Sequence, residues 1–198
     1  MWNDRYSEPG YLFGTEPAAF VRRMAPHVPP QSEVLCVADG EGRNSVWLAA
    51  QGHKVTAFDN APAALDKARA LAGEQGVEVN LHRAPIESWD WAQPFDAVVA
   101  VFVQFTPPDL RARFFEWMGQ AVRPDGLLLL HGYAPRQVDY GTGGPPQRSH
   151  MYTTDLLRRH FHGWDLLHLA DYDQHIEEGR GHSGRSALID LVARKTGR

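Results

Sequence analysis

The sequence predicts an α/β fold of three layers, in which helices cover both faces of a mostly parallel sheet. Strand-like and helix-like segments alternate along the chain, which is the pattern that parallel strands joined by crossover helices produce. Two final strand-like segments, residues 164–175 and 186–195, have no helix between them. We therefore expect them to form an antiparallel hairpin at one edge of the sheet.

The first half of the chain supplies three strands and two helices. Ala64, Leu65, Ala68 and Leu71 fall on one face at helical spacing, and Pro62 suits a first helical turn. The predicted strands are residues 34–37, 54–58 and 77–82, and the predicted helices are residues 44–51 and 62–75.

The second half completes a sheet of seven strands. Residues 96–102 are nearly all apolar, as expected for a central parallel strand that is covered on both faces. Asp109 and Pro124 mark the start and end of a helix over residues 109–122. The other predicted elements are a strand at 127–131, a short helix at 153–161 and the final hairpin, whose strands join through residues 177–184.

Residues 132–150 are rich in glycine and proline and are expected to form a long loop. Long loops in compact domains are often functional, so this segment is a candidate active-site loop. No repeat, low-complexity block or domain boundary is visible, and residues 1–198 are therefore expected to form a single domain.

Composition limits the class of protein. The net charge of -4 argues against a protein that binds duplex nucleic acid, which usually presents a basic face. Cys36 is the single cysteine, so an intramolecular disulfide is excluded and a reducing, cytoplasmic location is expected. The first residues lack the features of a secretory signal, and no apolar run is long enough to span a bilayer. The histidines lack the spacing of a metal site, so no metal is expected.

The segment VLCVADGEGRNSVWLA, residues 34–49, carries the strongest functional signal. Gly40 and Gly42 allow the backbone to turn sharply and approach a ligand, and the following helix offers free N–H groups at its start. Asp59 ends the second predicted strand. In a doubly wound sheet its carboxylate lies beside the glycine loop, where it can accept hydrogen bonds from ribose hydroxyls. The pattern predicts a site for a nucleoside cofactor.

The spacing of the glycines disfavours a dinucleotide. The G-x-G-x-x-G fingerprint would require glycine in place of Ser45, or, one step earlier, in place of Ala38. A Gly-Lys-Ser or Gly-Lys-Thr phosphate loop does not occur. A nicotinamide-dependent oxidoreductase is therefore the weaker alternative.

The stretch VLCVADGEGRN resembles motif I of the class I S-adenosylmethionine-dependent methyltransferases, and more narrowly the small bacterial enzymes related to tellurite-resistance and thiopurine methyltransferases. The resemblance extends over nearly the whole chain, through YLFGTEP, VTAFDN, FDAVVAVFVQF, VRPDGLLLLHGY, YGTGGPP and EEGRGHSGRSALIDLVARK. It implies a Rossmann-like methyltransferase fold, S-adenosyl-L-methionine as cofactor, and a lid or cap formed by residues 1–30.

Five segments are expected to contact the cofactor by this resemblance. They are the lid, the glycine loop, the end of the second strand, the turn after the third strand and the end of the fourth strand. The implied residues are Tyr11, Phe13, Gly14, Ala38, Asp39, Gly40, Gly42, Arg43, Asn44, Asp59, Asn60, Ala84, Pro85, Ile86 and Phe102.

Two positions depart from the family pattern. Members usually carry an acid where this chain has Cys36, and glycine where it has Ala38. That acid commonly holds the loop or reaches the amino group of the methionine moiety, a role for which Asp39 and Glu41 are the candidate substitutes. The departures leave open a protein that binds the cofactor without catalysis.

The resemblance also suggests catalytic residues. A similar glutamate-glycine-x-x-histidine turn approaches the substrate pocket in the family, which makes His182 a candidate base and Arg185 a candidate anchor for an anionic substrate. The alternative is a hairpin turn without chemistry. Further candidates for substrate contact are Tyr133, Arg136, Tyr140 and His150.

The predicted function is methyl transfer to a small-molecule acceptor, with a thiol or a chalcogen oxyanion as candidates. A soft nucleophile needs little base catalysis, whereas an amine or hydroxyl would make a base such as His182 more important. A methyltransferase acting on protein or nucleic acid is a further alternative, disfavoured by the lack of a basic excess. No membrane partner is expected, and no oligomeric state is indicated.

Overall fold

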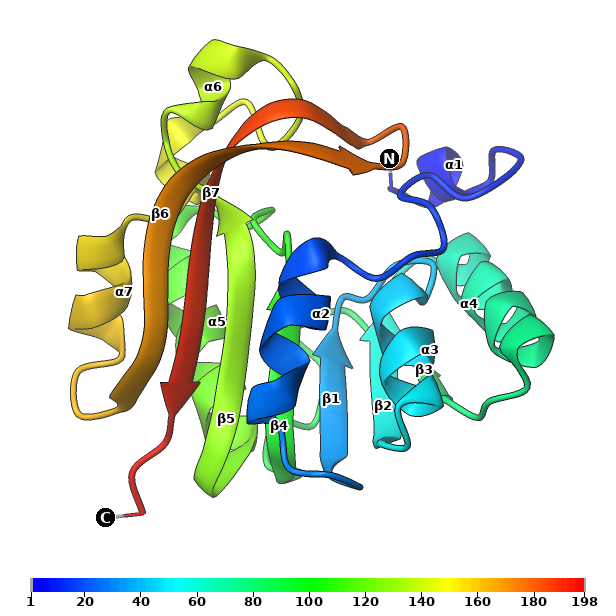
Figure 1. Ribbon diagram of the computed structural model, residues 1–198, viewed down its shortest axis with the longest axis horizontal. Helices are drawn as coiled ribbons and strands as arrows, with labels where there is room; N and C mark the ends of the chain where they lie inside the picture. Colours follow the sequence, from blue (N-terminus) through cyan, green and yellow to red (C-terminus); the bar gives the residue numbers. More distant parts are fainter. Residues whose placement is uncertain (1, 198) are drawn as a thin grey trace.

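The computed structural model describes residues 2–197 as a seven-stranded sheet between two layers of helices (Figure 1). The strand order is β3-β2-β1-β4-β5-β7-β6, and only β7 runs antiparallel to its neighbours β5 and β6. This confirms the predicted mostly parallel sheet with an antiparallel hairpin at its edge. The strands are β1 Glu33–Val37, β2 Lys54–Asp59, β3 Asn80–Arg83, β4 Phe95–Val101, β5 Val122–Tyr133, β6 Asp165–Glu178 and β7 His182–Arg194.

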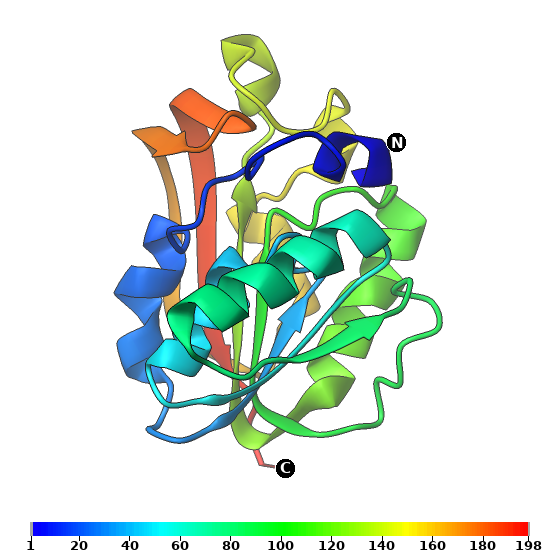
Figure 2. The ribbon, with the colours of Figure 1, turned by 90° about the vertical axis from the view of Figure 1, so that its right-hand side faces the viewer.

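Helices lie on both faces of the sheet. Helix α2 (Ala19–Met24), α3 (Arg43–Ala50) and α4 (Pro62–Gln75) cover one face, and α5 (Pro108–Ala121) and α7 (Thr154–His160) cover the other; α2 and α5 stand on opposite sides in Figure 2. The remaining helical segments are α1 Trp2–Tyr6, α6 Gln137–Tyr140 and the 3-10 turns Ala25–His27 and Arg148–His150.

The alternation of side chains along β1 explains the two layers. Val34 and Cys36 join the apolar cluster beneath α2 and α3, whereas Leu35 and Val37 join the cluster that packs against α5 and α7. Successive side chains of a strand point to opposite faces, so an unbroken apolar run buries both faces of the central strands. Cys36 is consequently a core residue, with 1% of its surface exposed.

Several predicted boundaries differ from the structure. The third strand begins at Asn80 rather than at residue 77, and β5 extends to Tyr133, into the predicted loop. That loop also contains α6 and a 3-10 turn, because its glycines separate short helical turns instead of preventing them. The hairpin turn is shorter than predicted, since Glu178 already pairs with His182.

The topology places the ends of the parallel strands together. The chain leaves β1 toward β2 on one side, while β4 lies on the other, and ligands bind at such a switch point, outside the carboxyl ends of the strands. Figure 1 shows α1 and the β6–β7 turn above this edge of the sheet. Within residues 2–197, no helix is long and apolar enough to cross a membrane.

Candidate functional site

A cleft of about 860 Å³ opens at the carboxyl edge of the sheet. This volume lies within the range of small-molecule sites, about 300–1,000 Å³. Residues predicted from five segments and from the hairpin turn line it together: Phe13, Gly14, Ala38, Asp39, Gly40, Arg43, Asn44, Asp59, Asn60, Ala84, Pro85, Ile86, Phe102 and His182.

The glycine loop keeps the expected shape despite the alanine. Ala38 adopts φ +46°, and Gly40 and Gly42 adopt +63° and +89°, so all three lie in the left-handed region. This conformation costs alanine about 1 kcal/mol, which glycine would avoid. At Gly42 a Cβ atom would lie 2.7 Å from the Cβ of Ala68, so glycine there permits the close contact of α3 with α4.

Asp59 ties the end of β2 to the glycine loop. Its buried carboxylate accepts hydrogen bonds from the amides of Gly40, at 2.9 Å, and Ala61, at 2.8 Å. Burial raises the pKa of Asp59, and the hydrogen bonds from these amides oppose that rise. A carboxylate has about four acceptor positions, so both oxygens retain capacity for ribose hydroxyls.

Asp39 is the second carboxylate of the loop. It accepts a hydrogen bond of 2.5 Å from the hydroxyl of Ser45. Burial raises the pKa of Asp39 to about 7, with the hydrogen bond from Ser45 opposing and the charge of Asp59 adding to the rise. Cys36 is in the core, and the loop presents two acids to the cleft, Asp39 and Glu41.

The other polar side chains of the loop hold residues 8–18, the N-terminal strap. Glu41 accepts a hydrogen bond of 2.7 Å from the amide of Leu12 and forms a 2.8 Å ion pair with Lys67. Asn44 accepts a 2.9 Å hydrogen bond from the amide of Ala18. Glu41 and Asn44, which belong to the glycine loop, therefore hold the N-terminal strap against that loop.

Arg43 connects the loop to the hairpin turn. Its guanidinium forms a 2.8 Å ion pair with Glu178, at the end of β6, and donates a hydrogen bond to the carbonyl of Phe13. Both partners of the ion pair are at most 10% exposed. One buried cation thus joins α3, the strap and the β6–β7 hairpin.

His182 lies between two aromatic rings. Phe13 and Phe102 stack on its two faces, with ring centroids 4.4 and 4.1 Å away. Its Nδ1 forms a 2.6 Å hydrogen bond with the hydroxyl of Tyr133. Burial, followed by the positive charges of Arg43 and neighbouring groups, lowers the pKa of His182 to about 2. The structure brings His182 into the cleft, but this environment does not fit the predicted role of a base.

Tyr133 is itself held in place by Gln104. The side-chain amide of Gln104 donates to the carbonyl of Tyr133 at 2.8 Å and accepts from its amide at 2.6 Å. A Cβ atom at Gly132 would lie 2.6 Å from the amide oxygen of Gln104, so this contact depends on glycine. The sequence offered no signal for this pairing, because Gln104 and Tyr133 lie on different strand ends.

Some predicted residues lie outside the cleft. Arg185 follows His182 by an odd number of residues along β7, so its side chain points to the other face and pairs with Asp173 at 2.8 Å. Arg136 and Tyr140 also bind Asp173. These three side chains therefore do not line the cleft, and their contact with a substrate stays a prediction.

Two predicted cofactor residues are also placed elsewhere. The hydroxyl of Tyr11 donates to the carbonyl of Lys67, and its ring packs beside Val46 and Leu71, between α3 and α4. Gly42 serves the helix contact with Ala68 and does not line the cleft. Their contribution is to the position of the strap and of α3.

The structure brings further residues to the cleft, from the predicted lid and from the β4–α5 connection, of which the sequence did not single out Arg5, Phe105 and Thr106. Helix α1 brings Trp2, Arg5 and Tyr6 to the cleft, and the β4–α5 connection brings Phe105 and Thr106. A helix of five residues is too short for a periodic signal. We call the far part of the cleft, lined by residues of 102–110, Tyr133 and residues of 143–150, the acceptor end. Tyr133 and His150 were predicted substrate contacts and lie there.

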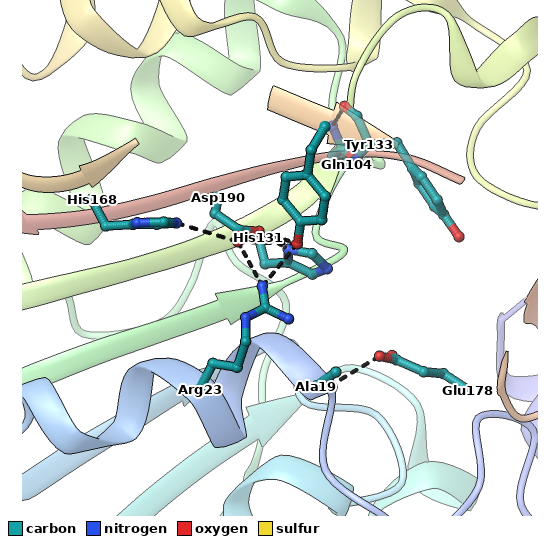
Figure 3. Close-up of polar contacts among 9 residues, drawn as sticks. Ala19, Arg23, Gln104, His131, Tyr133, His168, Glu178 and Asp190 are labelled. Carbon is teal, nitrogen blue, oxygen red and sulfur yellow. Dashed lines mark hydrogen bonds and ion pairs between the residues drawn. The ribbon is translucent and has the colours of Figure 1, made fainter. Parts of the chain in front are cut away.

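A buried polar network anchors α2 behind the cleft (Figure 3). Asp190 on β7 accepts hydrogen bonds from Arg23 of α2 at 2.8 Å and from Tyr172 of β6, and its Oδ1 lies 2.6 Å from Nδ1 of His131. The ring centroid of His131 also lies 4.8 Å from the ring centroid of Phe102. Within residues 2–197, no group of three His, Cys, Asp or Glu side chains could hold a metal ion.

Residues 34–126 match the family model described as a methyltransferase domain. Over these residues, which include the glycine loop, Asp59 and β4, the chain is similar to a methyltransferase domain. In detail it is similar to solved structures of TehB and its relatives. TehB from Haemophilus influenzae has a TM-score of 0.75 and 16% identity, over 98% of this chain and 66% of that one.

Another structure, solved in work on the conversion of a disulfide bond into a thioacetal group during echinomycin biosynthesis, has a TM-score of 0.78 and 18% identity, over 96% of this chain and 86% of that one. Among curated relatives, ubiquinone biosynthesis O-methyltransferase of Rickettsia conorii is 31% identical over 63% of this chain and 46% of the relative. The tRNA 5-carboxymethoxyuridine methyltransferase of Escherichia coli K12 is 26% identical over 64% and 54%. The chain thus spans about half the length of these relatives.

Proposed function

We propose that this protein transfers the methyl group of S-adenosylmethionine to a small-molecule thiol. The observation that carries the proposal is a cleft that joins the glycine loop and Asp59 to the acceptor end. There His182 is buried as a poor base, and among residues 102–110 and 143–150 no Asp, Glu or Lys lines the wall. We include three predictions from the sequence in this proposal. The chain forms a single domain, it acts in the cytoplasm, and the cleft-lining residues predicted to contact the cofactor do so.

The residues present fit the cofactor. Asp59 retains acceptor capacity for the ribose hydroxyls, and Ala84, Pro85 and Ile86 form an apolar wall suited to adenine. Asp39 supplies a carboxylate near the loop that suits the cationic methionine moiety. When bound, the cofactor would supply an activated methyl group on a sulfonium.

The chain's contribution is to position the reactants and exclude water. Methyl transfer requires in-line approach of a nucleophile, and such positioning can supply much of the rate. The N-terminal strap, fastened by Glu41, Arg43 and Asn44, and the hairpin turn lie around the cleft. They would shield the reacting atoms from solvent.

The acceptor end favours a thiol over an amine or alcohol. An amine or alcohol must lose a proton during transfer, and a histidine whose pKa is lowered to about 2 is a poor acceptor for it. A thiol ionises in water with a pKa of about 8.5, so a fraction of it is thiolate near neutral pH, and the thiolate is the reactive form. A chalcogen oxyanion is less favoured, because the acceptor-end segments supply no Arg or Lys to the cleft and Arg43, which lines it from α3, is paired with Glu178.

The names of the two curated relatives indicate different acceptors. One is an O-methyltransferase of ubiquinone biosynthesis, and the other is a tRNA 5-carboxymethoxyuridine methyltransferase. Since the chain spans about half of these proteins, they support methyl transfer but do not select the acceptor. The structure named for disulfide-to-thioacetal conversion supports sulfur chemistry on this fold.

A second candidate is a protein that binds the cofactor without turnover. The observation that favours it is the loop itself, where Ala38 holds a left-handed conformation and Cys36 replaces the usual acid.

An acceptor panel separates the two functions. The purified protein is incubated with S-adenosylmethionine and 2-mercaptoethanol, ethanolamine, phenol, selenite, tellurite or total tRNA, and S-adenosylhomocysteine is measured. The proposal expects product with the thiol in excess of every other acceptor. Cofactor binding without product from any acceptor would favour the binding protein, and product from tRNA alone would contradict a small-molecule acceptor.

A further inference from the structure

We infer that Tyr133 fixes His182 as the tautomer that carries its proton on Nε2, and that this N–H donates a hydrogen bond to the thiolate of the methyl acceptor. The inference rests on the proposed function and deepens it, because it states the ionic form in which the acceptor binds. Tyr133 is then a positioning residue, and His182 is a donor instead of a base.

The contact between the two side chains selects the tautomer. The hydroxyl of Tyr133 lies 2.6 Å from Nδ1 of His182. A phenol is a much stronger acid than a neutral imidazole N–H, so the phenol donates and Nδ1 accepts. A neutral imidazole carries one proton, which must then reside on Nε2.

The geometry holds this arrangement firmly. The main chain of Tyr133 is fixed on both sides by the amide of Gln104. The ring of His182 is confined between Phe13 and Phe102, so it cannot turn over without moving one of them. Both the position of the phenol and the orientation of the imidazole are therefore set before a ligand enters.

The Nε2 atom is free to meet a ligand. Across residues 2–197 it has no hydrogen-bond partner, and it does not belong to the unpaired polar atoms that are sealed from solvent. His182 lines the cleft and is 7% exposed overall. The small exposed part of this side chain therefore includes its N–H group.

The charged surroundings keep the ring neutral. Arg43 from α3 and Arg5 from α1 face it, as do the imidazole of His131 on β5 and Tyr133, while Glu178 at the end of β6 is paired with Arg43. Burial between two phenylalanine rings removes the water that would solvate an imidazolium. A cationic sulfonium in the same cleft would disfavour a second charge further.

The other titratable side chains of the acceptor end are Tyr133 and His150. The cleft-lining residues of 102–110 and 143–150 include no Asp, Glu or Lys. A thiol can ionise in water without a base, so in this inference the acceptor, without use of His150, loses its proton to solvent and binds as the thiolate. Its sulfur forms the new bond to the methyl carbon, the bond from that carbon to the sulfonium breaks, and the electron pair stays on the departing sulfur. A hydrogen bond from Nε2–H stabilises and aims the anion.

Nitrogen NMR tests the tautomer without relying on turnover. In the S-adenosylhomocysteine complex of ¹⁵N-labelled protein, His182 should show a protonated Nε2 and a bare Nδ1, unchanged from pH 5.5 to 8. In Tyr133→Phe the shifts should move toward a mixture of tautomers. Titration of His182 within this range, or a proton on Nδ1, would overturn the inference.

Two thiols of similar size but different acidity test the thiolate. For 2-mercaptoethanol and the more acidic 2,2,2-trifluoroethanethiol, kcat/KM should level off at the pKa of each thiol. A base on the enzyme would instead give both acceptors the same midpoint. His182→Gln retains an N–H donor and should keep the profile, whereas His182→Leu should lose about tenfold to a hundredfold in kcat/KM, the range for a hydrogen bond to a charged group.

These outcomes separate a failure of the inference about His182 from a failure of the proposed methyl transfer to thiols. A shared midpoint that disappears in His182→Gln contradicts the inference and leaves methyl transfer to thiols standing. Absence of methylation with both thiols contradicts the proposed function and the thiolate, while the NMR result still decides the tautomer.

Discussion

The carboxylate of Asp59 accepts a hydrogen bond from the amide of Gly40 at 2.9 Å. The two residues follow neighbouring parallel strands, in which Val37 pairs with Phe58. One hydrogen bond thus makes a single unit of the acid after β2 and the glycine loop after β1. The proposed function requires that Asp59 and the glycine loop together form the cofactor site.

Asp59→Ala should weaken binding of S-adenosylhomocysteine about tenfold or more. The substitution removes hydrogen bonds from the carboxylate to ribose, each worth about 1.5–3 kcal/mol, and frees the amide of Gly40. Isothermal titration calorimetry measures the affinity. Asp66→Ala is the control, since Asp66 is exposed on α4 and pairs with Arg69; equal affinities of the two variants would remove Asp59 from the site.

Affinity for S-adenosylmethionine should rise with pH between about 6 and 8. Burial raises the pKa of Asp39 to about 7, so this acid keeps its proton at pH 6 and has lost it at pH 8. The cationic cofactor favours the ionised form, and binding at the lower pH must first expel the proton. One released proton corresponds to at most about a tenfold change per pH unit.

Asp39→Asn is the control for this pH dependence. The variant cannot titrate, so its affinity should vary little over the same range, and Ser45 keeps a hydrogen-bond acceptor. A dependence that survives in the variant would assign the titration to another group. Affinity that falls as pH rises would contradict the charge argument itself.

Gly42→Ala should destabilise the protein by about 3 kcal/mol or more. The new Cβ would lie 2.7 Å from the Cβ of Ala68, and φ is +89°, so overpacking adds to the cost of a left-handed alanine. Gly76→Ala isolates the second cost, because Gly76 has φ +65° and open space around it. Urea unfolding should show a loss of about 1–2 kcal/mol there; similar losses in both variants would mean that the helix contact does not constrain position 42.

Arg43→Met should cost about 3–5 kcal/mol of folding free energy, because it leaves Glu178 buried without its cation. The strap should also become more sensitive to protease, since Arg43 binds the carbonyl of Phe13. Arg22→Met removes an exposed ion pair with Glu16 and should cost less than about 1 kcal/mol. If the two variants unfold at the same urea concentration, the buried pair does not fasten the strap.

The sequence was sufficient for the layers of the fold and for the cofactor end of the cleft. Periodic spacing over residues 62–75 predicted α4 with its observed bounds. Gly40 and Asp59 could be paired in advance because local signals and a parallel topology bring the ends of adjacent strands together.

The acceptor end was less predictable because its contacts join distant segments. The pairing of Tyr133 with His182 depends on how β5 and β7 curve over the sheet, and no spacing in the sequence encodes it. Arg185 lies outside the cleft for a related reason. The side on which a residue near a turn points depends on where strand pairing resumes, here at His182.

Calorimetric titration with S-adenosylmethionine, S-adenosylhomocysteine and NADH tests the central claim most directly. The account predicts saturable binding of the first two at one site per chain, weakened by Asp59→Ala, and no binding of NADH to that site. A preference for NADH, or binding of S-adenosylhomocysteine that Asp59→Ala leaves unchanged, would contradict it.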